Sequence, residues 1–131
     1  MKYILDTNTV GLAVRLNANL INKLETVSTN KLFISAVTLA EIHYGLSKKP
    51  NATKLHQTVQ EFLRRVSVLD WTNKTAIVYG TLRAEIEQQG LSLSALDMMI
   101  AAHAKSENAI LISNDQAFFK IPNLNVIDWT K

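Results

Sequence analysis

Hydrophobic residues occur along this chain in short continuous runs, separated by longer segments with helical periodicity. The runs occupy residues 2–5, 32–35, 66–69, 110–113 and 125–127. Several consist of consecutive Ile, Leu and Val rather than alternating apolar and polar residues. Such continuous runs are typical of parallel strands that are buried on both faces. The pattern therefore predicts five strands of a parallel sheet.

The segments between the runs have the spacing of amphipathic helices. We expect helices over residues 7–16, 20–27, 36–48, 51–64, 74–89 and 94–108, with a last short turn over 116–120. Pro50 predicts a break, Asn51 the N-cap of the next helix, and Gly90 a helix end. Strands that alternate with helices predict right-handed crossovers around a parallel sheet. We expect a single domain over residues 1–131, a three-layer α/β/α sandwich.

Four acidic residues occupy equivalent places in this pattern, at the junction of a strand and a helix or within the first turns of the helix. They are Asp6 in YILDTN, Glu41 in VTLAEIHYG, Asp97 in LSALDMMIAAHA and Asp115 in LISNDQAFF. In a parallel α/β fold such positions converge on one edge of the sheet. Carboxylates that lie close together repel one another unless a cation neutralises them. The pattern therefore predicts a divalent metal site and phosphodiester chemistry.

Each of these acids also has a purely structural explanation as part of a helix cap. Asp6 and Asp115 are suited to cap the helices that follow them, and Glu41 and Asp97 each stand three residues after a Thr or Ser, which is capping-box spacing. However, Glu41 and Asp97 lie in apolar helices, where an unpaired charge is unfavourable. Four acids at four equivalent positions are harder to explain by capping than any one of them.

The type of ligand indicates the metal. A site of carboxylates favours Mg²⁺, for which Mn²⁺ is expected to substitute. His43 and His103 point away from the neighbouring acids on their predicted helices, and His56 lies in a polar helix, so zinc is not expected. Four neutral polar neighbours are expected to orient carboxylates or waters, with cap and turn roles as the alternative: Thr7, Asn8, Ser113 and Asn114.

The charge balance becomes more informative once the four acids are set aside. The chain has 14 Lys and Arg against 11 Asp and Glu, a net charge of +3. If a metal neutralises the four acids, the other seven leave a net charge of +7. Such a surface favours a polyanionic partner such as RNA. Candidate phosphate contacts, unless they simply form a solvated face, are Lys48, Lys49, Lys54, Arg64 and Arg65.

Several classes of protein are excluded or disfavoured by what the sequence lacks. There is no cysteine, so no disulfide or thiolate metal site can form, which fits a reducing cytoplasm. No apolar run reaches the length of a membrane span. The chain has no phosphate-binding loop of the Gly-x-x-x-x-Gly-Lys-Ser/Thr type, and Asn8 stands where a phosphoaspartyl phosphatase needs a second Asp.

The four acidic motifs together resemble the PIN domain family, and most closely the VapC-type toxins of bacterial toxin–antitoxin pairs. The resemblance extends from Met1 to the Asp-Trp near the C-terminus. Asp6, Glu41 and Asp97 match the family's first three acidic positions, and Asp115 fits the fourth by its spacing to Phe118. One departure is Ser94-Ala95, where many relatives carry Gly or Pro before the third acid; this change would affect substrate fit rather than the chemistry.

The resemblance implies a Mg²⁺-dependent endoribonuclease with a compact α/β/α fold. Members of the family commonly form homodimers and are inhibited by a small antitoxin, through which the complex binds operator DNA. Many close relatives cut structured RNA, often tRNA. Two alternatives remain at this stage, a catalytically silent RNA- or protein-binding module and a DNA-directed nuclease.

Overall fold

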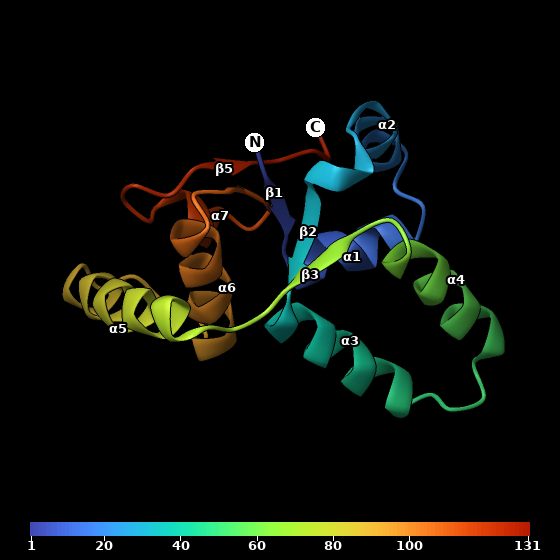
Figure 1. Cartoon of the computed structure of the whole chain (residues 1–131), viewed down its shortest axis with the longest axis horizontal. Helices are drawn as coiled ribbons and strands as arrows, with labels where there is room; N and C mark the ends of the chain where they lie inside the picture. Colours follow the sequence, from blue (N-terminus) through green and yellow to red (C-terminus); the bar gives the residue numbers. More distant parts are fainter.

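The computed structural model describes all 131 residues of the chain. Its centre is a five-stranded sheet in the order β3-β2-β1-β4-β5, and every pair of neighbouring strands is parallel (Figure 1). The predicted parallel sheet is therefore confirmed. Each strand lies within its predicted run and is at most one residue shorter: β1 (Tyr3–Leu5), β2 (Leu32–Ser35), β3 (Ser67–Leu69), β4 (Ile110–Ile112) and β5 (Val126–Ile127).

Helices connect every strand to the next. β1 is joined to β2 by α1 (Thr7–Val14), α2 (Ala18–Thr26) and the 3₁₀ turn η1 (Thr29–Lys31). β2 is joined to β3 by α3 (Ala36–Ser47) and α4 (Thr53–Leu63), and β3 to β4 by α5 (Asn73–Gln88) and α6 (Ala95–Ser106). The last connection, to β5, contains the single turn of α7 (Gln116–Phe119).

The sheet separates two hydrophobic cores, as the alternation of side chains along a strand requires. Ile4 and Leu111 pack with residues of α5 and α6 on one face. Leu5 and Ile112 pack with residues of α1 and α2 on the other. Figure 1 shows α5 and α6 on one side of the sheet, α1, α2 and α4 on the other, and α3 beyond the end of β2. The predicted three-layer sandwich is confirmed.

The order of the strands creates a switch point between β1 and β4. From β1 the chain builds outward through β2 to β3, and it then returns to place β4 on the other side of β1. The connections that leave the carboxyl ends of β1 and β4 therefore diverge to opposite faces of the sheet. This divergence opens a crevice at that edge, where ligands bind in folds of this kind.

Helix boundaries agree less well with the sequence than the strands do. The residue before α4 is Ala52, which makes no side-chain cap, so the expectation that Asn51 is the N-cap is wrong. In a different helix, the side chain of Asn17 accepts a hydrogen bond from Leu20 N–H and caps α2. This helix therefore begins two residues before its predicted start at residue 20. Gly90 does end α5, because its φ of 68° is the left-handed conformation that glycine adopts without strain.

His103 joins α6 to the strand β2. The side chain is 1% exposed, and its Nδ1 lies 2.7 Å from the hydroxyl of Ser35, the residue that caps α3. Its ring also meets the edge of Trp71 with centroids 5.6 Å apart. Burial lowers the pKa of His103, while Asp70 and Glu107 oppose that shift. The neutral ring is thus a packing element between the helices that carry Glu41 and Asp97.

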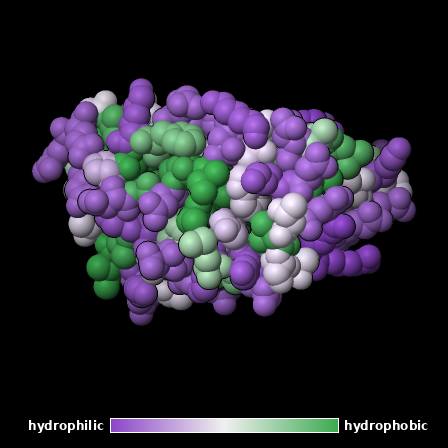
Figure 2. All heavy atoms as spheres, turned by 90° about the horizontal axis from the view of Figure 1, so that it is seen from above, coloured by the Kyte–Doolittle hydropathy of each residue, from purple (hydrophilic) through white to green (hydrophobic).

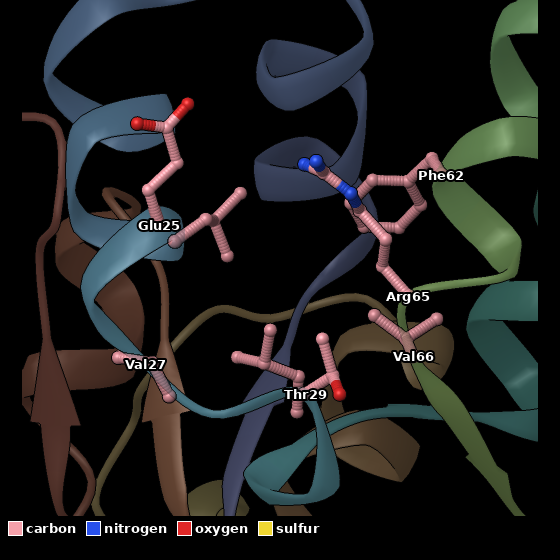
Figure 3. A pocket seen from close by; sticks show the side chains of 8 residues that line it. Glu25, Val27, Thr29, Phe62, Arg65 and Val66 are labelled. Atoms are coloured by element: carbon pink, nitrogen blue, oxygen red, sulfur yellow. The ribbon is translucent and has the colours of Figure 1, made fainter.

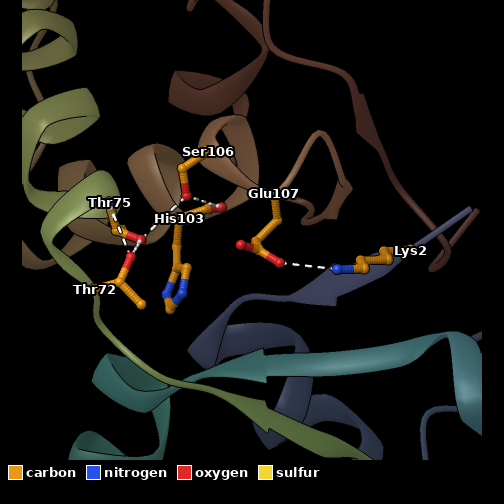
Figure 4. A network of polar contacts seen from close by, with 6 residues as sticks. All are labelled: Lys2, Thr72, Thr75, His103, Ser106 and Glu107. Carbon is orange, nitrogen blue, oxygen red and sulfur yellow. Dashed lines mark hydrogen bonds and ion pairs between the residues drawn. The ribbon is translucent and has the colours of Figure 1, made fainter.

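Hydroxyl groups surround this junction and connect α5 with α6 (Figure 4). The hydroxyl oxygens of Thr72 and Thr75 lie 3.0 Å apart, and that of Thr75 lies 3.3 Å from the hydroxyl oxygen of Ser106. The Ser106 hydroxyl donates a hydrogen bond to the backbone carbonyl oxygen of His103. Beyond the end of α6, an ion pair of 2.9 Å joins Lys2 to Glu107. These contacts fix the position of α6 relative to the sheet.

The outer surface is mostly hydrophilic. Figure 2, seen from the top of Figure 1, shows hydrophobic side chains gathered mainly in one patch, in the part of the molecule where α7 and β5 lie. These elements carry Phe119 and Ile127, which are 43% and 42% exposed. None of the helices combines the length and apolar character that a membrane crossing requires.

We predict that His103 makes the folded chain less stable as the pH falls below about 6.5. The unfolded chain takes up a proton at the ordinary histidine pKa and the folded chain resists it, so protonation favours unfolding. The free energy of unfolding, measured in urea, should fall by up to about 1.4 kcal/mol per pH unit from this group between pH 7 and 5.

The variant His103→Gln should lose this part of the pH dependence. Its control is His43→Gln, which replaces an exposed histidine away from Ser35 and Trp71 and should keep the slope that His103 causes. An identical slope in His103→Gln and in the unchanged protein would show that His103 is not the titrating group.

Candidate active site at the carboxyl edge of the sheet

A polar cavity of about 610 Å³ opens at the carboxyl edge of the sheet. Nine residues line it, and none of them is hydrophobic. The lining contains all four acids that the sequence singles out. The complete set is Asp6, Thr7, Asn8, Gly11, Arg15, Glu41, Asp97, Asn114 and Asp115. The fold therefore brings together carboxylates that are up to 109 residues apart in the chain.

Asp6 forms the floor of the cavity and is only 4% exposed. Its Oδ1 accepts a hydrogen bond of 2.8 Å from Thr9 N–H, which caps α1 as expected from the sequence. Its Oδ2 accepts a bond of 2.7 Å from the hydroxyl of Ser113, at the end of β4. Each oxygen keeps a second lone pair, so capping the helix and binding a cation are compatible.

Glu41 reaches the cavity from the middle of α3. Its Oε1 accepts a hydrogen bond of 2.7 Å from the Thr7 hydroxyl, which connects α3 to the start of α1. Ser35 is the residue that caps α3, so the capping-box explanation for Glu41 is wrong. Thr7 has one hydroxyl hydrogen, and the carboxylate can only accept, so this bond fixes the orientation of Glu41.

Asp97 lies in the first turn of α6, where Ser94 caps the helix by accepting a hydrogen bond from the Asp97 N–H. Burial raises the pKa of Asp97, the Ser94 hydroxyl opposes this, and the charges of Asp115, Asp6 and Glu41 raise the pKa further. The ionised form of Asp97 is therefore destabilised in the folded chain. Its carboxylate is electrostatically coupled to the three other acids.

Asp115 and two asparagines complete the rim. The Asp115 side chain caps α7 by accepting from Ala117 N–H at 3.0 Å, and the residue is exposed. Its own N–H donates to the Ser113 hydroxyl, the group that also binds Asp6. Asn8 donates to Asn114 at 2.8 Å and joins the first turn of α1 to the loop that follows β4. These polar neighbours connect the two sides of the crevice.

The donor set fits a hydrated magnesium or manganese ion. No three acidic or histidine side chains lie close enough to enclose an ion by themselves. Mg²⁺ does not require such a cage, because it retains several waters and is usually held by one or two carboxylates together with substrate phosphates. The side chains in the lining that could bind a cation do so through oxygen, and the buried His103 belongs to another network. No histidine or cysteine, the ligands that structural zinc sites usually take, lines the cavity.

The basic residues expected from the sequence do not share one location. Lys48 and Lys49 line a second cavity of about 410 Å³ that shares Thr7, Glu41 and two further residues with the first. Lys54 lines neither of the two. These positions make the two lysines at the end of α3 the best placed of the expected phosphate contacts.

The structure does not bring Arg64 and Arg65 to the carboxylates. Both precede β3 and lie at the amino edge of the sheet, because parallel strands all run toward the acidic cavity. Arg64 lines a polar hollow on α4. Arg65 extends with Phe62 into a small pocket of about 230 Å³ that faces Glu25 on α2 (Figure 3).

Sequence reasoning missed Arg15, the only basic residue in the lining of the acidic cavity. It follows the last residue of α1, nine positions after Asp6, in a segment without any other charge. Its spacing of eight residues from Thr7 places both on one face of α1. This spacing is the feature of the sequence from which the position of Arg15 near the acids could have been predicted.

Comparison with known proteins identifies the family of the chain. Residues 3–124 match the family model of the PIN domain. The chain belongs to the PIN domain family. Among similar proteins, Ribonuclease VapC2 of Rickettsia felis is 38% identical over 134 residues, covering 100% of both chains. The tRNA(fMet)-specific endonuclease VapC of Salmonella typhimurium is 32% identical over 130 residues, covering 98% of both.

Solved structures of similar chains share the whole fold. A chain in the crystal structure of VapBC2 from Rickettsia felis, bound to a DNA fragment from its promoter, has a TM-score of 0.91 at 37% identity, covering 98% of this chain and 99% of that one. A chain in DNA-bound VapBC from Salmonella typhimurium has a TM-score of 0.90 at 31% identity, covering 98% of both. The family and the fold expected from the sequence are both confirmed.

We predict that Asp97→Asn raises the melting temperature of the metal-free protein at pH 7 by about 2–4 °C. The folded chain raises the pKa of Asp97, so the ionised carboxylate destabilises it above that pKa. The difference between variant and unchanged protein should disappear as the pH falls below about 4, where the carboxylate is protonated in both states. Thermal unfolding in EDTA measures both effects.

A matched control is Glu61→Gln, since Glu61 is exposed and lies outside the acidic cavity. Added Mn²⁺ should raise the melting temperature of the unchanged protein and of the control more than that of Asp97→Asn. A lower melting temperature for Asp97→Asn in EDTA would contradict the repulsive cluster.

Proposed function

We propose that this chain is an endoribonuclease that requires a divalent cation and acts as the toxin of a toxin–antitoxin pair. The observation that carries the proposal is the convergence of Asp6, Glu41, Asp97 and Asp115 on one cavity without hydrophobic lining. This lining offers no complementary surface to an apolar substrate. It is complementary to a hydrated cation and a phosphodiester.

The roles of the side chains follow from their anchoring. Asp6, fixed by Thr9 and Ser113, and Asp97, in the first turn of α6, are proposed as the main metal ligands. Glu41, oriented by Thr7, and the exposed Asp115 would help to hold the ion. When bound there, Mg²⁺ would supply a lowered pKa for a water that attacks the phosphorus and positive charge that stabilises the phosphoryl group.

The hydrolytic step breaks the bond between phosphorus and the leaving sugar oxygen, and the attacking water supplies the new oxygen of the phosphate. Proton transfer from that water requires an acceptor at the cavity, and carboxylates are suited to this role. The exposed leaving oxygen takes its proton from solvent.

The proposed partners come from the relatives. Similar proteins are named as ribonucleases, one as an endonuclease specific for tRNA(fMet), and the similar solved chains are parts of VapBC complexes bound to DNA. We therefore expect structured RNA such as tRNA as the substrate and a small antitoxin as inhibitor. Operator DNA would be bound only through that antitoxin, and the toxin is expected to be a cytoplasmic homodimer.

We predict that the purified protein cleaves RNA in the presence of Mg²⁺ or Mn²⁺ and is inactive in EDTA. Asp97→Asn should lower the rate by about 100-fold or more, because it removes a charged ligand without changing the shape of the side chain. Glu61→Gln should retain full activity. The measurement is the rate of product formation from an RNA oligonucleotide and from a DNA oligonucleotide of the same sequence.

Product from RNA alone supports the endoribonuclease. Product from DNA alone would replace it with a DNA-directed nuclease. Cleavage that survives in both Asp97→Asn and Asp6→Asn would contradict the assignment of the site, and its absence from folded, metal-loaded protein would favour the binding module.

In a bacterial host, induced expression of the unchanged chain should arrest growth and create one dominant set of new RNA 5′ ends. Asp97→Asn, expressed to the same level, should do neither, because its fold is intact and its metal site is not. Sequencing of RNA 5′ ends after induction identifies the substrate, and new ends within tRNA would support the expected class. Equal growth arrest by both versions would show that toxicity does not require nuclease activity.

A further inference from the structure

Arg15 lines the acidic cavity from the C-terminal end of α1. Thr7, Gly11 and Arg15 follow one another at four-residue spacing and share one face of α1. Thr7 holds Glu41, and Gly11 and Arg15 continue the same wall of the cavity. The stripe therefore leads from the carboxylates toward the end of the helix.

The Arg15 side chain turns back along α1 and covers Gly11. A β-carbon at Gly11 would lie 3.5 Å from Arg15 Nη1 and 3.7 Å from Nη2, both ordinary contact distances. The guanidinium thus lies about one turn closer to Asp6 than its own backbone does. Residues four apart on a helix are separated by a rise of roughly 6 Å along the helix axis.

The Arg15 guanidinium has no partner within the chain. The two ion pairs of the structure are Lys2 with Glu107 and Arg83 with Glu87, and Arg15 donates no side-chain hydrogen bond. A guanidinium carries five N–H donors in a planar fork that matches phosphate oxygens. Arg15 lines a cavity with four carboxylates and is nevertheless unpaired, so its donors are available to a ligand.

Arg15 also marks the junction of two cavities. The second cavity shares Arg15, Gly11, Thr7 and Glu41 with the acidic one and extends to Lys48 and Lys49. A strand that leaves the carboxylates past Arg15 would next meet these two lysines. The acidic cavity alone offers no other cation to a phosphate.

We infer that Arg15 binds the oxygens of the phosphate next to the one being cleaved and directs the RNA strand toward Lys48 and Lys49. This inference rests on the proposed function, since it names the part of the site that holds the substrate. The carboxylates and their cation engage the phosphate that reacts, and Arg15 engages its neighbour. Arg15 is thus a positioning residue.

The test measures RNA binding separately from cleavage. Asp97→Asn protein, in Mg²⁺, is titrated against a fluorescent RNA oligonucleotide by anisotropy over a series of salt concentrations. Adding Arg15→Ala should weaken binding about 5- to 20-fold at low salt and reduce the slope of log K against log [salt] by about 0.7, the value for one phosphate contact on a single strand. Arg15→Lys should keep the slope and recover only part of the affinity.

The control is Arg83→Ala, which removes an arginine that is paired with Glu87 on α5, outside both cavities. Its affinity and slope should match those of the Asp97→Asn parent. The rise in melting temperature with Mn²⁺ should persist in protein that carries Arg15→Ala alone, which excludes a defect in the metal site.

Cleavage of the same oligonucleotide by the protein with Asp97 intact tests the nuclease activity separately from the phosphate contact of Arg15. If this protein cleaves the RNA, and adding Arg15→Ala to Asp97→Asn leaves the affinity and slope unchanged, the role of Arg15 is overturned and the nuclease stands. If there is no cleavage but Arg15→Ala loses one phosphate contact, the nuclease is overturned and the contact stands. Absence of both cleavage and binding overturns both.

Discussion

The buried negative charge of Asp6 is the constraint on which the rest of the site depends. At 4% exposure its carboxylate has almost no water, so the chain must supply hydrogen-bond donors. Thr9 N–H supplies one from α1, and the Ser113 hydroxyl supplies the other from the end of β4. Because Ser113 also accepts from Asp115 N–H, stabilising this single charge fixes the loops on both sides of the switch point.

Local structure offsets part of the repulsion among the four acids. Asp6 and Asp115 cap α1 and α7, and Asp97 lies in the first turn of α6, where the partial positive charge of a helix N-terminus favours an anion. Glu41 lies within a helix and depends on Thr7 instead. The compensation is incomplete, since the pKa of Asp97 remains raised. The ionised carboxylate of Asp97 therefore lowers the stability of the folded chain relative to an uncharged side chain at this position.

The sheet and the acidic site were predictable because both follow from strand positions. Continuous apolar runs identified the strands, and residues that follow parallel strands meet at one edge. Residues that precede parallel strands meet at the opposite edge of the sheet. Arg64 and Arg65 precede β3, so this rule predicts their position away from the acids. The contact between Thr7 and Glu41 joins residues 34 apart, and the path of the Arg15 side chain over Gly11 depends on rotamers. Neither leaves a periodic signal in the sequence.

If the proposed function holds, an acidic cavity that accepts a polyanion requires the cation and the RNA to bind cooperatively. Without a cation, Asp6, Glu41, Asp97 and Asp115 repel a phosphate, and Arg15 is the only opposing charge in the lining. Without RNA, no three of the acidic side chains are close enough to enclose an ion, so the ion lacks ligands that substrate phosphates can provide. Under the proposed function, each ligand would therefore complete the site for the other. Because linkage is reciprocal, RNA would then raise the affinity for the cation by the same factor as the cation raises the affinity for RNA.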